Sequence, residues 1–247
     1  ILHINSYFFG NTVHRNFVKT VRGAGFLQTV FVPVPLNSDR RPANLPGIEI
    51  LPKKCFSGFD RIFWPLKIVR IWKTFKNLQC VNDASLMHAH SLFSNGLIAY
   101  LAKKKFGTPY CVTIRNTDLS VFLGRLRFIF RPIAIQILEC ADAVVTLSPN
   151  YCNLPKKILF NCTHFCRFEE KHLLIPSGAD DFWFSNRSFK KNLRDVPKLL
   201  FVGRIDKNKN LSVVLAACRK LINNGFPIEL NVVGDGPQLS FLTEEAA

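Results

Sequence analysis

The sequence predicts an α/β protein in which parallel sheets are flanked by helices and arranged in two domains. Short apolar, β-rich segments alternate with helix-like segments along the chain, and strands that alternate with helices form parallel sheets with right-handed crossovers. A hydrophobic content of 48% supports a packed core. The rhythm breaks at residues 181–197, which are polar, basic and weakly periodic. We therefore expect a first domain at 1–180, a linker at 181–197 and a second domain at 198–247.

The first domain is expected to open with a strand–helix–strand unit and to continue in the same rhythm. Pro33, Pro35 and Pro42 predict a loop after the second strand. The expected strands are Leu2–Asn5, Gln28–Val34, Ile48–Leu51, Ser85–His90, Tyr110–Ile114 and Ala143–Leu147, and the expected helices are Val13–Val21, Arg61–Leu78, Phe93–Phe106 and Val121–Cys140.

The second domain repeats this rhythm only briefly. Its strands are predicted at Leu199–Val202, a run that suits a strand covered on both faces, and at Ile228–Val233, with a helix at Leu211–Asn224 between them. Two strands and one helix cannot bury a self-sufficient core. We expect the second domain to be incomplete in this sequence, as part of a C-terminally truncated chain.

The segment Lys198–Lys209 holds the first candidate binding loop. Gly203 ends the strand, and Arg204 and Lys209 follow at the carboxyl end, where open α/β sheets bind ligands. Arginine as a planar fork and lysine as a point charge suit a diphosphate. The alternative is an ordinary loop with solvated charges.

Two further turns carry candidate residues. Gly10 precedes a helix whose N-terminus is placed to approach an anion, although a simple turn explains one glycine equally well. Arg115, Asn116, Thr117 and Asp118 follow the strand Tyr110–Ile114, a position typical of site residues. Thr117 or Asp118 would serve equally as a helix cap.

The net charge of +16 favours anionic partners, which are nucleic acid, an acidic membrane surface or phosphorylated substrates. The segments Arg61–Leu78 and Val121–Cys140 combine aromatic with basic residues, a composition typical of interfacial membrane helices. A surface helix with a solvated basic face is the alternative. No apolar stretch approaches the roughly 20 residues that span a bilayer.

The eight cysteines show no regular pairing, which indicates reduced thiols in a cytosolic protein. Cys152, Cys162 and Cys166 lie near His164 and His172 but lack the tight C-x2-C spacing of zinc sites. We therefore expect buried thiols and no metal.

Six stretches together resemble the retaining glycosyltransferases of the GT-B fold, specifically family 4, in order and in approximate spacing across essentially the whole chain. They are MHAH at Met87, TIRNTD at Thr113, ADAVVTLS at Ala141, IPSGADDF at Ile175, VGRIDKNKN at Val202 and VVGDGP at Val232.

The resemblance implies two Rossmann-like domains, of which the first mainly receives the acceptor and the second holds a nucleotide-diphospho-sugar. It implies that Arg204 and Lys209 bind the donor diphosphate and stabilise the leaving group. The catalytic set that it implies also includes Arg115 and Asp118. The donor-binding residues that it implies are Gly10, Arg204, Lys209, Gly234, Asp235 and Gly236.

The predicted function is transfer of a hexose, with retention of configuration, onto a lipid-linked or polysaccharide acceptor during bacterial surface polysaccharide or glycolipid synthesis. We expect a cytoplasmic protein at the inner face of an anionic membrane, with no metal cofactor. The alternatives are a non-catalytic nucleic-acid-binding α/β protein and a nucleotide-sugar epimerase or hydrolase. The sequence departs from the family at three places. Ser177 replaces the asparagine of the family's Pro-Asn-Gly, and Asn116 replaces the glycine that follows its histidine. The family's glycine-rich first loop is reduced to Gly10. The E-x7-E region of the family, which contacts the donor sugar, is expected beyond Val233 and is not found in this sequence.

Overall fold

The computed structural model describes residues 1–10, 12–41, 44–61, 63–118, 122–123, 126–151, 168–186 and 196–246. It divides into two compact units, Ile1–Phe184 and Ser185–Ala247, each described here by itself. The boundary falls within the segment 181–197 that the sequence marks as a linker. A short helix, α7 (Asp181–Ser185), lies at the start of this segment.

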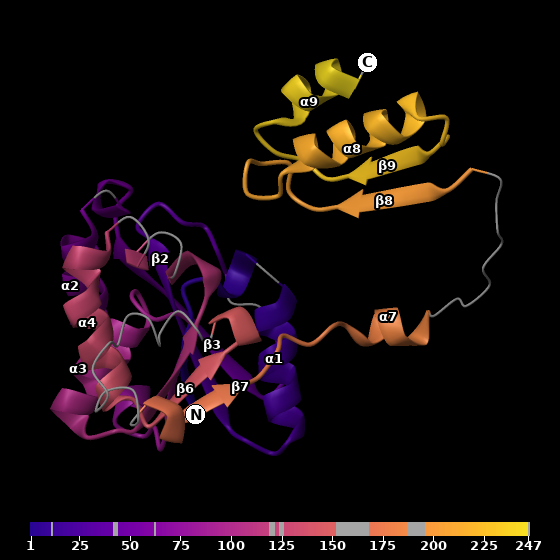
Figure 1. The fold of residues 1–247 in the computed structure, drawn as a ribbon. Helices are drawn as coiled ribbons and strands as arrows, with labels where there is room; N and C mark the ends of the chain where they lie inside the picture. Colours follow the sequence, from indigo (N-terminus) through magenta and orange to yellow (C-terminus); the bar gives the residue numbers. More distant parts are fainter. Residues whose placement is uncertain are drawn as a thin grey trace. The chain divides into compact units, whose positions relative to one another are not determined.

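Seven parallel strands form the sheet of the first unit, in the order β3-β2-β1-β4-β5-β6-β7 (Figure 1). The order reverses between β1 and β4, so the chain extends the sheet in one direction up to β3 and in the other from β4 onward. The strands are β1 (Leu2–Ile4), β2 (Gln28–Pro35), β3 (Ile48–Phe56), β4 (Met87–Ala89), β5 (Tyr110–Ile114), β6 (Ala143–Thr146) and β7 (His172–Leu174).

Helices cover both faces of this sheet. α2 (Trp64–Phe75), α3 (Gly96–Phe106) and α4 (Arg127–Cys140) lie on one face, and α1 (Thr12–Gly23) lies on the other (Figure 1). The larger core lies between the sheet and the three helices, and the ring centroids of Phe31 and Phe75 lie 5.1 Å apart within it. A smaller core joins Val18 of α1 to Val30 and Val32 of β2. The predicted α/β class with a parallel sheet is confirmed.

The loop predicted at Pro33 and Pro35 is wrong, because β2 continues through both prolines to pair with a β3 longer than expected. β1 pairs with β2 only as far as Phe31. Beyond Phe31 the edge of β2 that faces β1 has no strand to pair with. A proline, which lacks the backbone N–H, therefore breaks no hydrogen bond of the sheet there.

Three of the predicted helices are longer than the observed ones. α2 spans 12 residues with Pro65 in its first turn, as expected, and α3 begins at Gly96 rather than at Phe93. α4 begins at Arg127 and tolerates Pro132 near its start. Residues 121, 124 and 125 of the predicted N-terminal portion of this helix lie outside the described residues.

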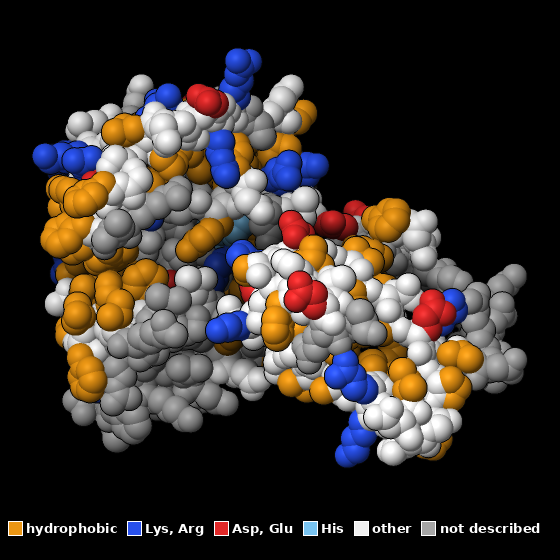
Figure 2. All heavy atoms as spheres, turned by 90° about the horizontal axis from the view of Figure 1, so that it is seen from above, with side chains coloured by type: hydrophobic (Ala, Val, Ile, Leu, Met, Phe, Trp, Pro, Cys, Tyr) orange, Lys and Arg blue, Asp and Glu red, His pale blue; other side chains and the backbone are white. Residues whose placement is uncertain are grey.

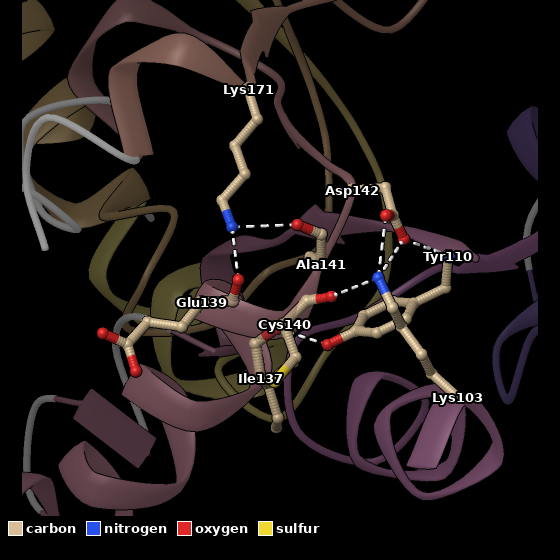
Figure 3. Close-up of polar contacts among 8 residues, drawn as sticks. All are labelled: Lys103, Tyr110, Ile137, Glu139, Cys140, Ala141, Asp142 and Lys171. Atoms are coloured by element: carbon tan, nitrogen blue, oxygen red, sulfur yellow. Dashed lines mark hydrogen bonds and ion pairs between the residues drawn. The ribbon is translucent and has the colours of Figure 1, made fainter. Parts of the chain in front are cut away.

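Two lysines hold the C-terminal end of α4 (Figure 3). Lys171 donates to the carbonyl oxygens of Glu139 at 2.6 Å and Ala141 at 2.8 Å. Lys103 donates to the carbonyl of Cys140 at 2.9 Å and pairs with the Asp142 carboxylate. The last carbonyls of a helix have no partner within the helix, so cations at this end stabilise it. These contacts tie α3 and the residue before β7 to the start of β6.

The second unit consists of β8 (Lys198–Val202), α8 (Leu211–Asn223), β9 (Glu229–Val233) and α9 (Leu239–Ala246). β8 and β9 pair in parallel, and Ile205, Leu211 and Leu242 form the buried core. The expectation that β8 is covered on both faces is wrong, because Leu200 and Val202 are 67% and 68% exposed. Phe201 packs against the core beside α8, whereas the opposite face of the two-stranded sheet has no covering element among the described residues.

Within the part of the chain that the structure describes, no helix has both the length and the apolar character needed to cross a membrane. Of the predicted cysteine and histidine cluster, Cys152, Cys162, Cys166 and His164 lie outside the described residues. His172 lies on β7 and its Nε2 is 2.7 Å from the hydroxyl of Thr146.

Candidate functional site

The point at which the strand order reverses, between β1 and β4, positions the site of the first unit. In open α/β sheets, ligands bind outside the carboxyl ends of the strands at such a reversal. Three turns meet here, because β1 and β4 are neighbours and β5 pairs with β4. They are the turn after β1 (Asn5–Gly10), the turn after β4 (His90–Asn95) and the turn after β5 (Arg115–Asp118).

Asp118 joins two of these turns. Its buried carboxylate accepts the backbone N–H groups of Arg115 at 2.9 Å, Leu92 at 3.0 Å and Phe93 at 3.4 Å. Burial raises the pKa of this carboxyl, although the three N–H groups and the Arg115 charge act in the opposite direction. Asp118 therefore binds the backbone of both turns and positions the residues that they carry. The helix cap that the sequence offered as an alternative would involve residues 119–121, which lie outside the described residues.

Arg115 lies half-buried at the centre of the site. Its Nε donates to the carbonyl of His90 at 2.8 Å, and its Nη2 lies 3.4 Å from Nδ1 of His14. Burial lowers the pKa of the guanidinium, while the Asp118 charge raises it. Arginine nevertheless stays protonated in proteins, so the site holds one fixed cation.

The neighbours of His14 determine its tautomer. Oδ1 of Asn5 accepts the N–H of Tyr7 at 3.0 Å, so the other end of this amide is the Nδ2 that lies 3.0 Å from Nδ1 of His14. Nδ1 therefore accepts and Nε2 carries the hydrogen. Burial first, and then the Arg115 charge, lower the pKa of His14 to about 4. At neutral pH the ring is uncharged and presents one N–H donor.

Three buried histidines lie behind this site. His3, His88 and His90 each offer a ring nitrogen, and these atoms lie within 4.8 Å of one another, as in a metal site. Hydrogen bonds within the protein also explain the burial of His3 and His90 without a metal. Nε2 of His3 lies 2.9 Å from Oε1 of Gln28, and Nδ1 of His3 lies 3.2 Å from Nε2 of His90. Among the described residues, these three histidines form the cluster with the spacing to hold a metal ion. They also line a cavity of about 670 Å³ beneath α1.

Gly10 does not present a free amide. It closes a single turn of 3-10 helix (Phe8–Gly10), and its N–H donates to the carbonyl of Tyr7 at 3.0 Å. In this conformation the turn already uses the N–H of Gly10, and its binding of a donor phosphate stays a prediction.

In the second unit, the loops after β8 and β9 pack on each other through glycine. A Cβ on Gly234 would lie 1.9 Å from the carbonyl oxygen of Gly203, and one on Gly236 would lie 2.2 Å from that of Ile205. Ile205 also donates to the carbonyl of Asp235 at 2.9 Å. A side chain at position 234 or 236 would therefore clash with the backbone of the loop after β8. The two predicted donor loops pack directly against each other.

Arg204 and Lys209 are presented by the loop after β8. Nε of Arg204 lies 3.1 Å from the Asp206 carboxylate, and the arginine side chain is 70% exposed. The other oxygen of that carboxylate accepts the N–H groups of Asn208 and Lys209 and so shapes the loop. In the neighbouring loop, Oδ1 of Asp235 accepts the N–H of Gly236 at 2.7 Å.

Sequence reasoning missed Asn5, Tyr7 and His14. Asn5 and Tyr7 follow β1, and their only sequence signal is that polar residues come directly after a buried strand. His14 lies within α1 and has no such signal. His90 belongs to the MHAH stretch, but its place beside His3 depends on the pairing of β1 with β4.

Comparison with known families gives one match to this chain. The model of the glycosyl transferase 4-like domain matches residues 11–151, which is more than half of the 247 residues. The matched segment contains His14, His90, Arg115 and Asp118. No curated protein matches the chain.

Solved structures share the fold over nearly all of the chain. A structure of trehalose-6-phosphate synthase, from a study of enzymatic glycosyltransfer with retention, has a TM-score of 0.65 at 11% identity and covers 99% of this chain. The catalytic domain of starch synthase IV from Arabidopsis thaliana, bound to ADP and acarbose, has a TM-score of 0.63 at 14% identity and 99% coverage. Os79 T291V from O. sativa, in complex with UDP, has a TM-score of 0.54 at 13% identity and covers 98%.

The chain spans 66%, 70% and 74% of the lengths of these three structures, respectively. At such low identities the likenesses show the fold alone, and that fold is the GT-B architecture of two Rossmann-like domains expected from the sequence.

Proposed function

This chain belongs to the glycosyl transferase 4-like family, and we propose that it transfers a sugar from a nucleotide-diphospho-sugar to a lipid-linked or polysaccharide acceptor. The observation that carries the proposal is the glycine-packed pair of loops that presents Arg204 and Lys209 at the carboxyl end of β8. Negative charge grows on a diphosphate leaving group in the transition state. Fixed cations aimed at that charge lower the barrier by preorganised electrostatics.

In the proposed mechanism, Arg204 and Lys209 bind the donor diphosphate and need no metal to neutralise it. The loop Gly234–Gly236 lies against theirs and forms the nucleotide side of the donor site. Arg204 suits this role because a guanidinium binds two phosphate oxygens at once, while Lys209 adds a mobile point charge.

The first unit contributes the acceptor side. Arg115 supplies a fixed cation, and His14 supplies a neutral N–H donor able to bind a sugar hydroxyl or phosphate oxygen. Asp118 acts through the backbone by setting the turn that carries Arg115. We name no nucleophile. Retention of configuration and a hexose donor follow from the family resemblance and remain part of the proposal.

We also propose that the protein works on the cytoplasmic side of a membrane, where bacterial polysaccharide or glycolipid precursors are built. Large apolar side chains at the N-terminal ends of α2 and α4 are exposed, with Phe59 at 70% and Phe128 at 83%. The two ends adjoin, because the rings of Trp64 and Phe130 meet at 5.0 Å.

Charge around these ends supports an anionic lipid surface. Between residues 50 and 81 the one acidic residue, Asp60, is buried and paired with Arg70 at 2.7 Å. Seen from the top of Figure 1, the first unit displays hydrophobic and basic side chains with few acidic ones (Figure 2). Exposed aromatics beside Lys and Arg favour binding to anionic membranes. Binding to phosphatidylglycerol vesicles but not to phosphatidylcholine vesicles is the expected result.

The enzymatic proposal is tested by donor turnover in the full-length protein. Arg204→Ala and Lys209→Ala should each lower kcat by about 10²-fold or more, as removal of a transition-state donor does. Lys207→Ala is the matched control, because Lys207 is an exposed cation of the same loop. Unchanged turnover in both test variants would overturn the assignment of the donor site.

A further inference from the structure

A second cavity lies at the carboxyl edge of the sheet, between the ends of β2 and β3 and the turns after β1 and β4. Its volume is about 340 Å³, at the small end of the roughly 300–1,000 Å³ typical of ligand pockets. Its apolar wall is Val32–Pro35 and Phe56. Its polar lining is Ser6, Tyr7, Ser38, Arg40, Lys67 and Ser94.

This lining has the chemistry of an anion site. Arg40 and Lys67 are cations contributed by different segments, and Ser38 and Ser94 add hydroxyl groups from two turns. No aspartate or glutamate is among the described residues that line the cavity. Arginine and lysine beside hydroxyl donors are the groups that bind phosphate oxygens.

Aromatic rings hold both cations in place. The guanidinium carbon of Arg40 lies 5.5 Å from the ring centroid of Phe9, and Nζ of Lys67 lies 4.8 Å from that of Phe56. The ring quadrupole attracts a cation that lies over its face, which restricts the position of the side chain. Positioning before binding reduces the entropy lost when a ligand is held.

The cavity adjoins the site built around Arg115. Tyr7 lines it and stacks on His14 at 6.5 Å between ring centroids. Ser6, also in the lining, donates to Oδ1 of Asn95 at 2.7 Å in the turn after β4. The ring of Tyr7 therefore separates a phosphate in the cavity from His14, which contacts Arg115 and which we assign to the acceptor.

We infer that this cavity binds a phosphate group of the acceptor, so that the substrate class is a phosphorylated acceptor rather than a neutral saccharide. The inference rests on the proposed glycosyl transfer and deepens it. The phosphate has two possible sources, a lipid-linked phosphate or diphosphate and a soluble sugar phosphate. The chemistry at the cavity is the same for both.

The binding test uses inorganic phosphate and the full chain. All samples carry Arg204→Gln and Lys209→Gln, so that the proposed donor loop does not contribute. Adding Arg40→Gln and Lys67→Gln should weaken phosphate binding by about tenfold or more, since two charged hydrogen bonds are lost. Isothermal titration calorimetry gives the affinities, and circular dichroism checks that the variants are folded.

The matched control removes the same two charges elsewhere on the unit, by Lys104→Gln and Lys105→Gln on α3. Both side chains are exposed and lie outside the cavity, and this control should change phosphate affinity by less than about twofold. Equal weakening by control and test variants, or no phosphate binding in the parent chain, contradicts the inference.

The kinetic test compares three acceptors with the full-length enzyme: a polyprenyl-diphosphate-linked sugar in detergent, a soluble sugar 6-phosphate and the same sugar without phosphate. Arg40→Gln with Lys67→Gln should raise KM for whichever phosphorylated acceptor is used and leave the KM for the donor unchanged. Equally efficient use of the neutral sugar overturns the inference and leaves glycosyl transfer intact. Absence of donor turnover with every acceptor contradicts the proposed function instead, and the phosphate-binding result stands apart from it.

Discussion

The carboxylate of Asp118 accepts a hydrogen bond from the backbone N–H of Leu92 at 3.0 Å, across 26 residues of sequence. This bond and its neighbours to Arg115 and Phe93 connect the turn after β5 to the turn after β4. An aspartate that a resemblance would place among catalytic residues thus organises the backbone from which Arg115 reaches His90 and His14.

Replacing Asp118 should therefore affect stability as well as activity. Asp118→Ala leaves three buried N–H groups without their acceptor and should lower the free energy of unfolding by about 2 kcal/mol. Asp118→Asn keeps one acceptor oxygen and should lose less. Urea denaturation measures both, with the exposed Asp83→Asn as the control. An unchanged unfolding midpoint for Asp118→Ala would show that the turn holds itself without the carboxylate.

Adding a methyl group at Gly234 should disrupt the second unit. The new Cβ would meet the backbone oxygen of Gly203 at 1.9 Å, and a backbone atom cannot give way as a flexible side chain can. We expect Gly234→Ala to destabilise the unit by about 2 kcal/mol or more. Hydrogen exchange followed by mass spectrometry on peptides from 198–246 reports this locally.

Gly203→Ala is the matched control for Gly234→Ala. Its Cβ would make only ordinary contact with the Phe201 ring, at 3.7 Å. If both variants exchange alike, the close approach of the two loops is not what requires glycine at position 234.

The buried histidines predict that the first unit loses stability in mild acid. Burial is the largest cause that holds the pKa of His3 at about 4 and of His88 at about 3. In the unfolded chain these rings have a pKa of about 6.5. Below that pH the histidines are protonated in the unfolded state but stay neutral in the folded state. The free energy of unfolding therefore decreases as the pH falls.

Each such histidine should reduce the free energy of unfolding by up to about 1.4 kcal/mol per pH unit below its unfolded pKa. Thermal unfolding between pH 7.5 and pH 5 tests this before most carboxylates titrate. Replacing His88 by Gln should flatten the slope. A midpoint that stays constant or rises between pH 6.5 and pH 5 contradicts the prediction.

The end of α4 gives a further prediction from the geometry in Figure 3. Lys171→Met keeps the apolar stem but leaves the carbonyls of Glu139 and Ala141 without their donor. We expect a loss of about 1–3 kcal/mol in the free energy of unfolding. Lys19→Met on the exposed side of α1 is the control and should change stability by less than about 0.5 kcal/mol. Equal effects of the two would mean that water replaces the lysine without cost.

The sequence by itself was sufficient to predict the alternating elements, the parallel sheet and the loop that carries Arg204 and Lys209. Apolar periodicity, glycine stops and short β-rich runs are local properties, and a local pattern reports on the element that contains it. The GT-B fold was foreseen from the order of six short stretches, none of which is specific alone. Proline as a loop signal was misleading at Pro33 and Pro35, because β1 ends before it reaches them and the missing N–H groups break no ladder bond there.

Only the tertiary structure decided which residues meet. His3 and His88 are register partners because β1 pairs with β4. The tertiary structure also places Asn5 beside His14 and His14 beside Arg115. The requirement for glycine at Gly234 likewise arises from a carbonyl 31 positions earlier in the chain. Such contacts depend on strand order and on the packing of one loop against another. A pattern read along the chain carries no information about either.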